Sequence, residues 1–231
     1  MMARRSTKWR PRVVGVIASR SDLERALGMR RPPDLFELRL DRLAGMAAQV
    51  KNLLPKLHTP LIITARHQLE GGAGKLRLRQ RRDLLAQFLN HAHHIDVELR
   101  SAPALRSLLT LAEKKNVRRI ISFHNFKSTP STRLLAAKAR KAKSYRADIL
   151  KVATRTDTPA ELARLVEFTT NSRMDLPLAV MGIGKLGAIS RVLLARAGSV
   201  LIYASLGAAS DIEGQLSLEE LRALGFGASK Y

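Results

Sequence analysis

The sequence contains no cysteine, and this absence excludes disulfides, thiolate zinc sites and cysteine nucleophiles. Aromatic residues make up only 4% of the chain, which is little material for the stacking platforms of proteins that bind single-stranded nucleic acid. No apolar run approaches the length of a membrane span, and no apolar leader follows the basic residues 1–11. We therefore expect a cytoplasmic protein that does not enter a membrane.

Acidic residues are also few, because 19 Asp and Glu stand against 41 Lys and Arg, and the formal net charge is +22. This charge attracts anions and raises nucleic-acid binding as an alternative function. The basic residues are spread along the whole chain, with local excesses at 75–82 and 138–146. No zinc-finger spacing or RNP-like aromatic strand accompanies them. We therefore expect solvated helix faces and only non-specific attraction to nucleic acid.

Eight short apolar segments recur along the chain, and stretches with helical patterning separate them. The segments start 22 to 34 residues apart, which is about the length of one strand–helix step. They predict strands at 12–18, 35–41, 61–66, 95–99, 119–124, 149–154, 178–182 and 200–206.

Helices are predicted between these strands, with apolar residues at helical spacing in 44–57 and 77–90. In the second of these segments Leu78 falls on the apolar side, together with Leu84, Leu85 and Phe88. Proline is favoured in the first turn of a helix. Three prolines are predicted there: Pro103, Pro130, and Pro159 behind the N-cap Thr158.

Eight alternating units predict a (β/α)8 TIM barrel that forms a single catalytic domain over residues 12–231, preceded by a basic tail at 1–11. The alternative is an open, doubly wound sheet, since periodicity alone cannot establish closure. A barrel predicts that the chemistry lies at the carboxyl ends of the strands.

One lysine, Lys151, lies in the middle of the apolar segment 148–154. A buried ammonium without a partner is costly, and a neutral amine is a nucleophile that forms a Schiff base with a carbonyl. The alternative is an ordinary strand residue whose ammonium reaches solvent past its aliphatic stem. The polar residues elsewhere in the chain are needed to distinguish a Schiff-base lysine from an ordinary strand residue.

Further ionisable residues cluster near the ends of the predicted strands. Alternation along the second strand predicts Glu37, Arg39 and Asp41 on one face. Other strand ends carry Arg66, Glu70, Asp96, Glu98, His124 and Arg191. An internal ion-pair network that merely fills the barrel is one alternative. So many buried charges are costly without a function, however, and we predict an active site at this rim.

Eight short motifs carry a resemblance to a known family. In chain order they are Glu37-x-Arg39-x-Asp41, Thr64-x-Arg66-x3-Glu70-Gly71-Gly72, Asp96-x-Glu98, Ser122-x-His124-x-Phe126, Ala147-Asp148-Ile149-x-Lys151, Met181-Gly182, Ser190-Arg191 and Gly214-Gln215. In this order and at these spacings, from about Val14 to Leu221, the chain resembles the type I 3-dehydroquinate dehydratases.

The resemblance implies a shikimate-pathway lyase that converts 3-dehydroquinate to 3-dehydroshikimate and water, as a homodimer and without metal or cofactor. It implies that Lys151 forms a Schiff base with the substrate ketone, that His124 is the general acid and base, and that Glu70 supports His124 or the proton relay. Arg191 and Gln215 would bind the substrate carboxylate, and Glu37, Arg39 and Arg66 would position the hydroxyls and the lysine. The alternatives are another class I Schiff-base aldolase, or a nucleic-acid-binding protein derived from the barrel and without dehydratase activity.

The sequence departs from the family in the segment before Gln215. The family usually has Ser-Ala-Pro-Gly-Gln there, on a loop that closes over the substrate, whereas this chain has Asp211 in place of the serine and Glu213 in place of the proline. Ser210 would restore the serine by a shift of one residue. Two acids near an anionic substrate predict weaker binding, unless they point away or pair with basic residues.

Overall fold

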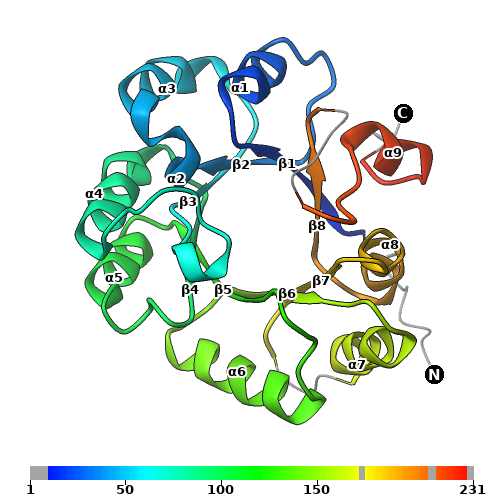
Figure 1. The fold of residues 1–231 in the computed structure, drawn as a ribbon. Helices are drawn as coiled ribbons and strands as arrows, with labels where there is room; N and C mark the ends of the chain where they lie inside the picture. Colours follow the sequence, from blue (N-terminus) through cyan, green and yellow to red (C-terminus); the bar gives the residue numbers. More distant parts are fainter. Residues whose placement is uncertain (1–9, 172–174, 208–211, 228–231) are drawn as a thin grey trace, which may run out of the picture.

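Eight parallel strands form a barrel with helices around it in the computed structural model, which describes residues 10–171, 175–207 and 212–227 (Figure 1). Hydrogen-bonded neighbours run in the order β7-β6-β5-β4-β3-β2-β1-β8. The two ends of this order, β7 and β8, meet where the Val200 amide, just before β8, donates to the Leu178 carbonyl of β7 over 2.8 Å, and this contact helps to close the ring. The strands are β1 (Arg12–Ile17), β2 (Leu35–Arg39), β3 (Leu61–Thr64), β4 (His94–Glu98), β5 (Arg118–Asn125), β6 (Ile149–Arg155), β7 (Leu178–Ile183) and β8 (Leu201–Ser205).

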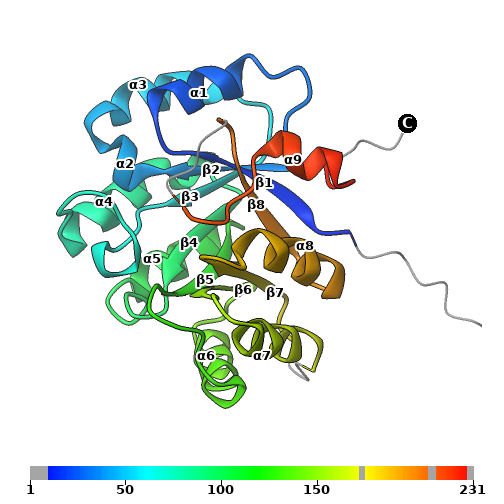
Figure 2. The ribbon, with the colours of Figure 1, turned by 45° about the vertical axis from the view of Figure 1, so that its right-hand side comes forward.

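The helices lie outside this ring and flank the strands (Figures 1 and 2). They are α1 (Arg20–Leu27), α2 (Leu40–Leu43), α3 (Ala47–Leu53), α4 (Leu78–Phe88), α5 (Arg106–Lys114), α6 (Thr132–Ser144), α7 (Pro159–Thr170), α8 (Gly187–Ala197) and α9 (Leu218–Ala223). Among the described residues, none of the helices is long and apolar enough to cross a membrane. The predicted TIM barrel is confirmed, and the open doubly wound sheet is excluded.

All eight predicted strands are present, but β2 ends earlier than predicted, because Leu40 and Asp41 begin α2 instead of continuing the strand. Asp41 therefore does not share a strand face with Glu37 and Arg39. The predicted basic tail, residues 1–11, lies outside the described residues except for Arg10 and Pro11.

The predicted helix starts were right at one proline and wrong at two. Thr158 caps α7, where its side chain accepts from the Glu161 amide and Pro159 is the first helical residue. The other two prolines, Pro103 and Pro130, precede helices that begin at Arg106 and Thr132. The apolar side of α4 also differs from the prediction, because Leu78 is 43% exposed.

The strands are apolar on both faces, as expected when side chains pack both inside the barrel and against the helices. Residues near the amino ends of the strands fill the interior, among them Val14, Leu35, Ile62, Ile120 and Ile149. Alternate residues pack outward in the larger cluster under the helices. The inward-facing polar residues come later along the strands. The apolar core therefore fills the amino-terminal part of the barrel, and the charged groups lie at the carboxyl ends of the strands.

His94 is a polar residue near the amino end of a strand, where the other interior residues named above are apolar. It begins β4, and alternation places it on the same face as Asp96 and Glu98. The side chain is buried, and neither ring nitrogen has a hydrogen-bond partner among the described residues. Burial, reinforced by the charges of Arg12 and Arg118, lowers the pKa of His94 to about 4. The folded protein therefore holds a neutral imidazole here.

This imidazole predicts a loss of stability on acidification. Its pKa is about 4 in the folded chain against 6.5 in the reference state, so the unfolded chain takes up the proton first as the pH falls. The His94 contribution to the free energy of unfolding should decline by about 2 kcal/mol between about pH 7.5 and pH 5. Urea unfolding should show that His94→Leu removes this decline, whereas His58→Gln, at an exposed position, retains it. An equal decline in wild type and His94→Leu would contradict the assignment.

Candidate active site

A cavity of about 240 Å³ opens at the carboxyl ends of the strands. Its lining carries charged and aromatic side chains contributed by strands and by the segments that follow them. It includes all eight residues for which the sequence predicted a role: Glu37, Arg39, Arg66, Glu70, His124, Lys151, Arg191 and Gln215. The fold thus brings together residues that lie up to 178 positions apart in the chain.

Lys151 projects from β6 into the barrel, and its side chain is only 6% exposed. Its Nζ donates to Glu37 Oε1 over 3.3 Å and to Asp96 Oδ2 over 3.2 Å. Burial alone would raise the pKa of Asp96, but the charges of Arg66 and Lys151 hold it well below its ordinary range. An ammonium reaching solvent along the outside of the strand is therefore excluded, and the amine lies at the cavity wall.

Arg66 is the guanidinium that fixes this arrangement. Its two terminal nitrogens donate to the two carboxylate oxygens of Asp96, over 3.0 and 2.7 Å. A bidentate pair of this kind has both charge and fixed geometry. Arg66 also lies 3.6 Å from Glu98, whose other oxygen accepts from Arg81 of α4. Every one of these charges thus has an opposite charge beside it, as a buried network requires.

The sequence did not reveal the part that Arg81 plays. The residue is 2% exposed, and its Nε donates to the Ala65 carbonyl over 2.7 Å. An arginine on an amphipathic helix in a chain this basic is normally read as surface. Only its packing under the strand ends distinguishes it from its exposed neighbours Arg79 and Arg82.

His124 and Glu70 form a hydrogen-bonded pair. The Nδ1 of His124 lies 3.0 Å from Glu70 Oε2, which also accepts from the His124 amide over 3.0 Å. Burial raises the pKa of Glu70 to about 7. Burial, together with the charges of Arg66 and Lys151, lowers the pKa of His124 well below its ordinary value. The imidazole is therefore neutral near pH 7, and the proton that titrates there belongs to the carboxyl side of the pair.

Asp41 reaches the site although it is not on β2. Its carboxylate accepts from Arg39 over 3.0 and 2.9 Å, from the Arg66 amide over 3.1 Å and from the Ala73 amide over 2.9 Å. Burial opposes ionisation, but these donors, led by Arg39, lower the pKa of Asp41. Arg39 also donates to the Gly71 carbonyl over 3.1 Å. Asp41 therefore ties the end of β2 to the segment that follows β3.

Arg191 differs from the other buried cations of the cavity. It is 3% exposed, and its Nε donates to the Gly214 carbonyl over 3.0 Å. No carboxylate of the described residues lies within 4.0 Å of it. Burial lowers its pKa to about 10, so the guanidinium remains charged at neutral pH. A buried cation without an acidic partner is complementary to an anionic ligand.

The loop before Gln215 also contributes to the site. Ile212 and Gln215 line the cavity, whereas Asp211 lies outside the described residues. Glu213 pairs with Arg155 over 3.0 Å, and its carbonyl accepts from the Gly184 amide over 3.1 Å. Glu213 does not line the cavity. Its charge is thus paired with a basic residue, the condition under which the sequence predicted no penalty for substrate binding.

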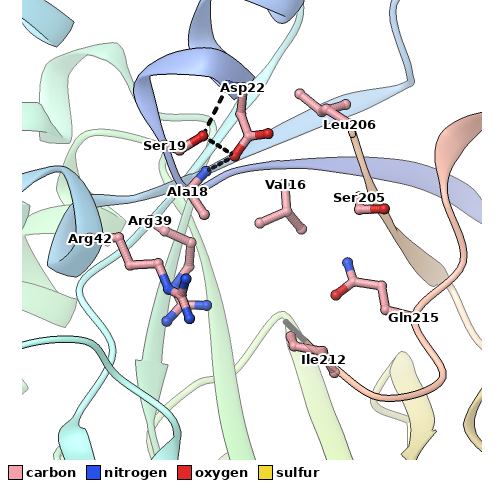
Figure 3. Close-up of a pocket in the computed structure, with 10 residues that line it drawn as sticks. All are labelled: Val16, Ala18, Ser19, Asp22, Arg39, Arg42, Ser205, Leu206, Ile212 and Gln215. Atoms are coloured by element: carbon pink, nitrogen blue, oxygen red, sulfur yellow. Dashed lines mark hydrogen bonds between the residues drawn. The ribbon is translucent and has the colours of Figure 1, made fainter. Parts of the chain in front are cut away.

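A second pocket, of about 230 Å³, adjoins the first on the side of α1 (Figure 3). Arg39 and Arg42 line one side of it, and Gln215 lies across the space from them (Figure 3). The wall near α1 is polar, because Asp22 accepts from the Ser19 hydroxyl over 2.8 Å.

No group of acidic or histidine side chains in the described part of the chain is arranged to hold a metal ion.

Tyr203 is a cavity residue that sequence reasoning missed. It lies on β8, is 3% exposed, and its ring centroid lies 3.9 Å from Lys151 Nζ. Alternation in the eighth predicted strand is compatible with an inward side chain at 203, but nothing in the sequence distinguishes this tyrosine from an ordinary core residue.

Comparison with known proteins gives the family of this chain. The family model of type I 3-dehydroquinase matches residues 16–226. The 3-dehydroquinate dehydratase of Geobacillus thermodenitrificans is 32% identical over 222 residues, which cover 91% of this chain and 86% of that protein. The 3-dehydroquinate dehydratase of Pyrococcus abyssi is 33% identical over 195 residues, which cover 83% of this chain and 86% of that protein.

Solved structures agree with the sequence comparisons. The type I 3-dehydroquinate dehydratase of Clostridium difficile, solved with covalently modified comenic acid, superposes with a TM-score of 0.83 at 25% identity over 93% of this chain and 91% of that one. The 3-dehydroquinate dehydratase of Geobacillus kaustophilus gives a TM-score of 0.81 at 27% identity, over 93% and 89%. The chain therefore belongs to the type I 3-dehydroquinase family, the type I 3-dehydroquinate dehydratases, which are lyases.

Proposed function

We propose that the protein converts 3-dehydroquinate to 3-dehydroshikimate and water through a Schiff base on Lys151. The observation that carries the proposal is the position of Nζ, which is buried at the wall of the cavity that His124 also lines. The two residues lie on adjacent strands, where Ser122 is the register partner of Lys151 and His124 that of Ala153. An amine and a base on one wall of a cavity suit the two halves of this reaction.

The reaction begins when the deprotonated Lys151 amine adds to the substrate ketone to give a carbinolamine, which takes up one proton and loses water to become an iminium. His124 then accepts a proton from the adjacent carbon, and the electron pair moves into the iminium to form an enamine. The enamine electrons expel the neighbouring hydroxyl, which takes a proton from His124 and leaves as water. Hydrolysis of the remaining iminium releases the product and restores the amine.

Glu70 supports the base in this scheme. Because its carboxyl group occupies Nδ1 of His124, Nε2 is the nitrogen left to face the substrate. The substrate carboxylate is proposed to bind at Arg191 and Gln215, with Arg191 supplying the charge that lacks an acidic partner. Glu37, Arg39 and Arg66 are proposed to position the hydroxyls and Lys151.

We also propose that residues 12–231 act as one catalytic domain, that the chain is a cytoplasmic homodimer, and that neither metal nor cofactor takes part. The single domain rests on the eight strand–helix units and the cytoplasmic location on the composition. The homodimer and the absence of metal and cofactor rest on the family resemblance. Binding of nucleic acid is expected to be limited to non-specific attraction by the net charge of +22.

The Schiff base predicts a covalent product on one lysine. Borohydride added in the presence of 3-dehydroquinate should attach the reduced ligand to Lys151, as peptide mass spectrometry will detect. Lys151→Ala should lose labelling and about 10³-fold or more in kcat, because the nucleophile is absent. Lys185→Ala, at an exposed position after β7, is the matched control and should keep both. Wild-type turnover in Lys151→Ala, or a label on another lysine, would contradict the mechanism.

The Glu70–His124 pair predicts the acid limb of the pH profile. The pKa of Glu70 is about 7, above its reference value of 4.5, so the carboxyl is neutral below that pH and ionised above it. The ionised carboxyl accepts the Nδ1 hydrogen and leaves Nε2 as the base, whereas the neutral carboxyl can donate its own hydrogen to Nδ1, so kcat should rise as the pH rises through about 7. Glu70→Gln should lose about 10–100-fold in kcat together with this limb. Glu24→Gln, exposed on α1, should keep both, and an unchanged limb in Glu70→Gln would contradict the assignment.

The fork of Arg191 predicts how the substrate carboxylate is held. Arg191→Lys keeps a positive charge but loses the bidentate geometry, so KM for 3-dehydroquinate should rise about 10–100-fold while kcat falls much less. Arg196→Lys, an exposed position on the same helix, is the matched control. Steady-state kinetics measure both constants, and a KM unaltered in Arg191→Lys would place the carboxylate elsewhere.

A further inference from the structure

Tyr203 has a contact that the mechanism above leaves unused. Its ring faces the amine of Lys151, with 3.9 Å between Nζ and the ring centroid. Its hydroxyl is buried and has no hydrogen-bond partner among the described residues. Burial and the nearby carboxylates Glu37 and Asp96 raise the pKa of Tyr203 well above its ordinary value, so the phenol stays neutral. The side chain therefore offers Lys151 the face of an uncharged ring.

We propose that Tyr203 is a further catalytic residue, whose ring face stabilises the positive charge on the Lys151 nitrogen through the iminium stage. The inference rests on the proposed Schiff base. A cation over the face of an aromatic ring is attracted by the ring quadrupole within about 6 Å, and most strongly where water is excluded. Both conditions hold here, because Tyr203 is 3% exposed and the Lys151 side chain 6%.

The need for such a contact follows from the hydrogens that the nitrogen loses. An ammonium has three N–H donors, and Nζ uses them toward Glu37 and Asp96. An iminium formed from a ketone keeps one N–H, so at least one of these two hydrogen bonds is lost when the substrate is attached. The ring contact does not depend on an N–H direction, so it persists through the change.

The two carboxylates are also shared with other donors. Asp96 accepts both terminal nitrogens of Arg66, and Glu37 Oε1 accepts from the Thr64 hydroxyl over 2.8 Å. Neither is therefore free to follow the nitrogen as it becomes part of the substrate. The ring of Tyr203 is held by burial on β8 and has no competing cation within the described contacts.

The test replaces Tyr203 by phenylalanine and then by phenylalanines carrying one, two and three ring fluorines. Fluorination weakens the negative face of the ring with little change in its size. The rate of borohydride trapping at Lys151 and kcat are measured for each protein. We expect the Phe variant to stay within about threefold of wild type, the rates to fall stepwise to about tenfold or more below it with three fluorines, and Tyr203→Leu to lose about 10–30-fold.

The control is the same fluorinated series at Phe226, whose ring lies 4.8 Å from the Arg196 guanidinium, a cation outside the cavity. That series should leave trapping unchanged. Urea midpoints for all variants separate a loss of folding from a loss of rate, because the expected trend follows the fluorine count and not the midpoint.

Three results would overturn the proposal. Rates that stay flat along the series would exclude the ring face, and a large loss in the Phe variant would assign the role to the hydroxyl. A trend that follows the urea midpoints would make the residue structural.

Failure of the Schiff base itself is distinguishable, because wild type would then show no label on Lys151, and the role of Tyr203 would fall with it. A label in wild type with a flat series would refute the Tyr203 role alone.

Discussion

The structure depends on the neutralisation of charge inside the barrel. Asp96 is central, because it binds Arg66 through both oxygens and Lys151 through one of them. Each ion would cost several kcal/mol to bury by itself, and only a network with good geometry offsets that cost. Glu98 extends the network to Arg81 on α4. The position of the amine thus depends on a helix outside the barrel as well as on the strands.

The balance of charge is broken at one place among the buried cations of the cavity. Arg66 and Lys151 have carboxylates beside them, whereas Arg191 contacts carbonyl oxygens and a sulfur of the described chain. This asymmetry gives the cavity a direction, with the Lys151 amine at a wall where charges are paired and the Arg191 guanidinium, which has no acidic partner among the described residues, at another. The proposed binding of an anionic ketone would use this direction, with the carboxylate at Arg191 and the carbonyl at Lys151.

One departure from the pattern that the sequence resembles lies in the loop before Gln215. Glu213 stands where the family usually has proline, and it is held by Arg155 at the end of β6, the strand that carries Lys151. The exposed pair is expected to contribute little to stability, since both side chains remain partly solvated. The pair places the Glu213 carboxylate beside Arg155, and Glu213 does not line the cavity, whereas Ile212 and Gln215 do.

The sequence by itself determined the eight strand–helix units, because strands buried on both faces read as continuous apolar runs. It also indicated that ionisable groups from several strands gather at one rim, because the carboxyl ends of the strands meet there. It placed Asp41 on the wrong element, since alternation does not say where a strand ends. It could not reveal Arg81 or Tyr203. The sequence does not distinguish a buried arginine from a surface arginine, or a core tyrosine from a tyrosine that contacts an amine. Only the tertiary structure decided these, through partners distant in the chain: Arg81 lies 17 residues from Glu98, and Tyr203 faces a lysine two strands away around the ring.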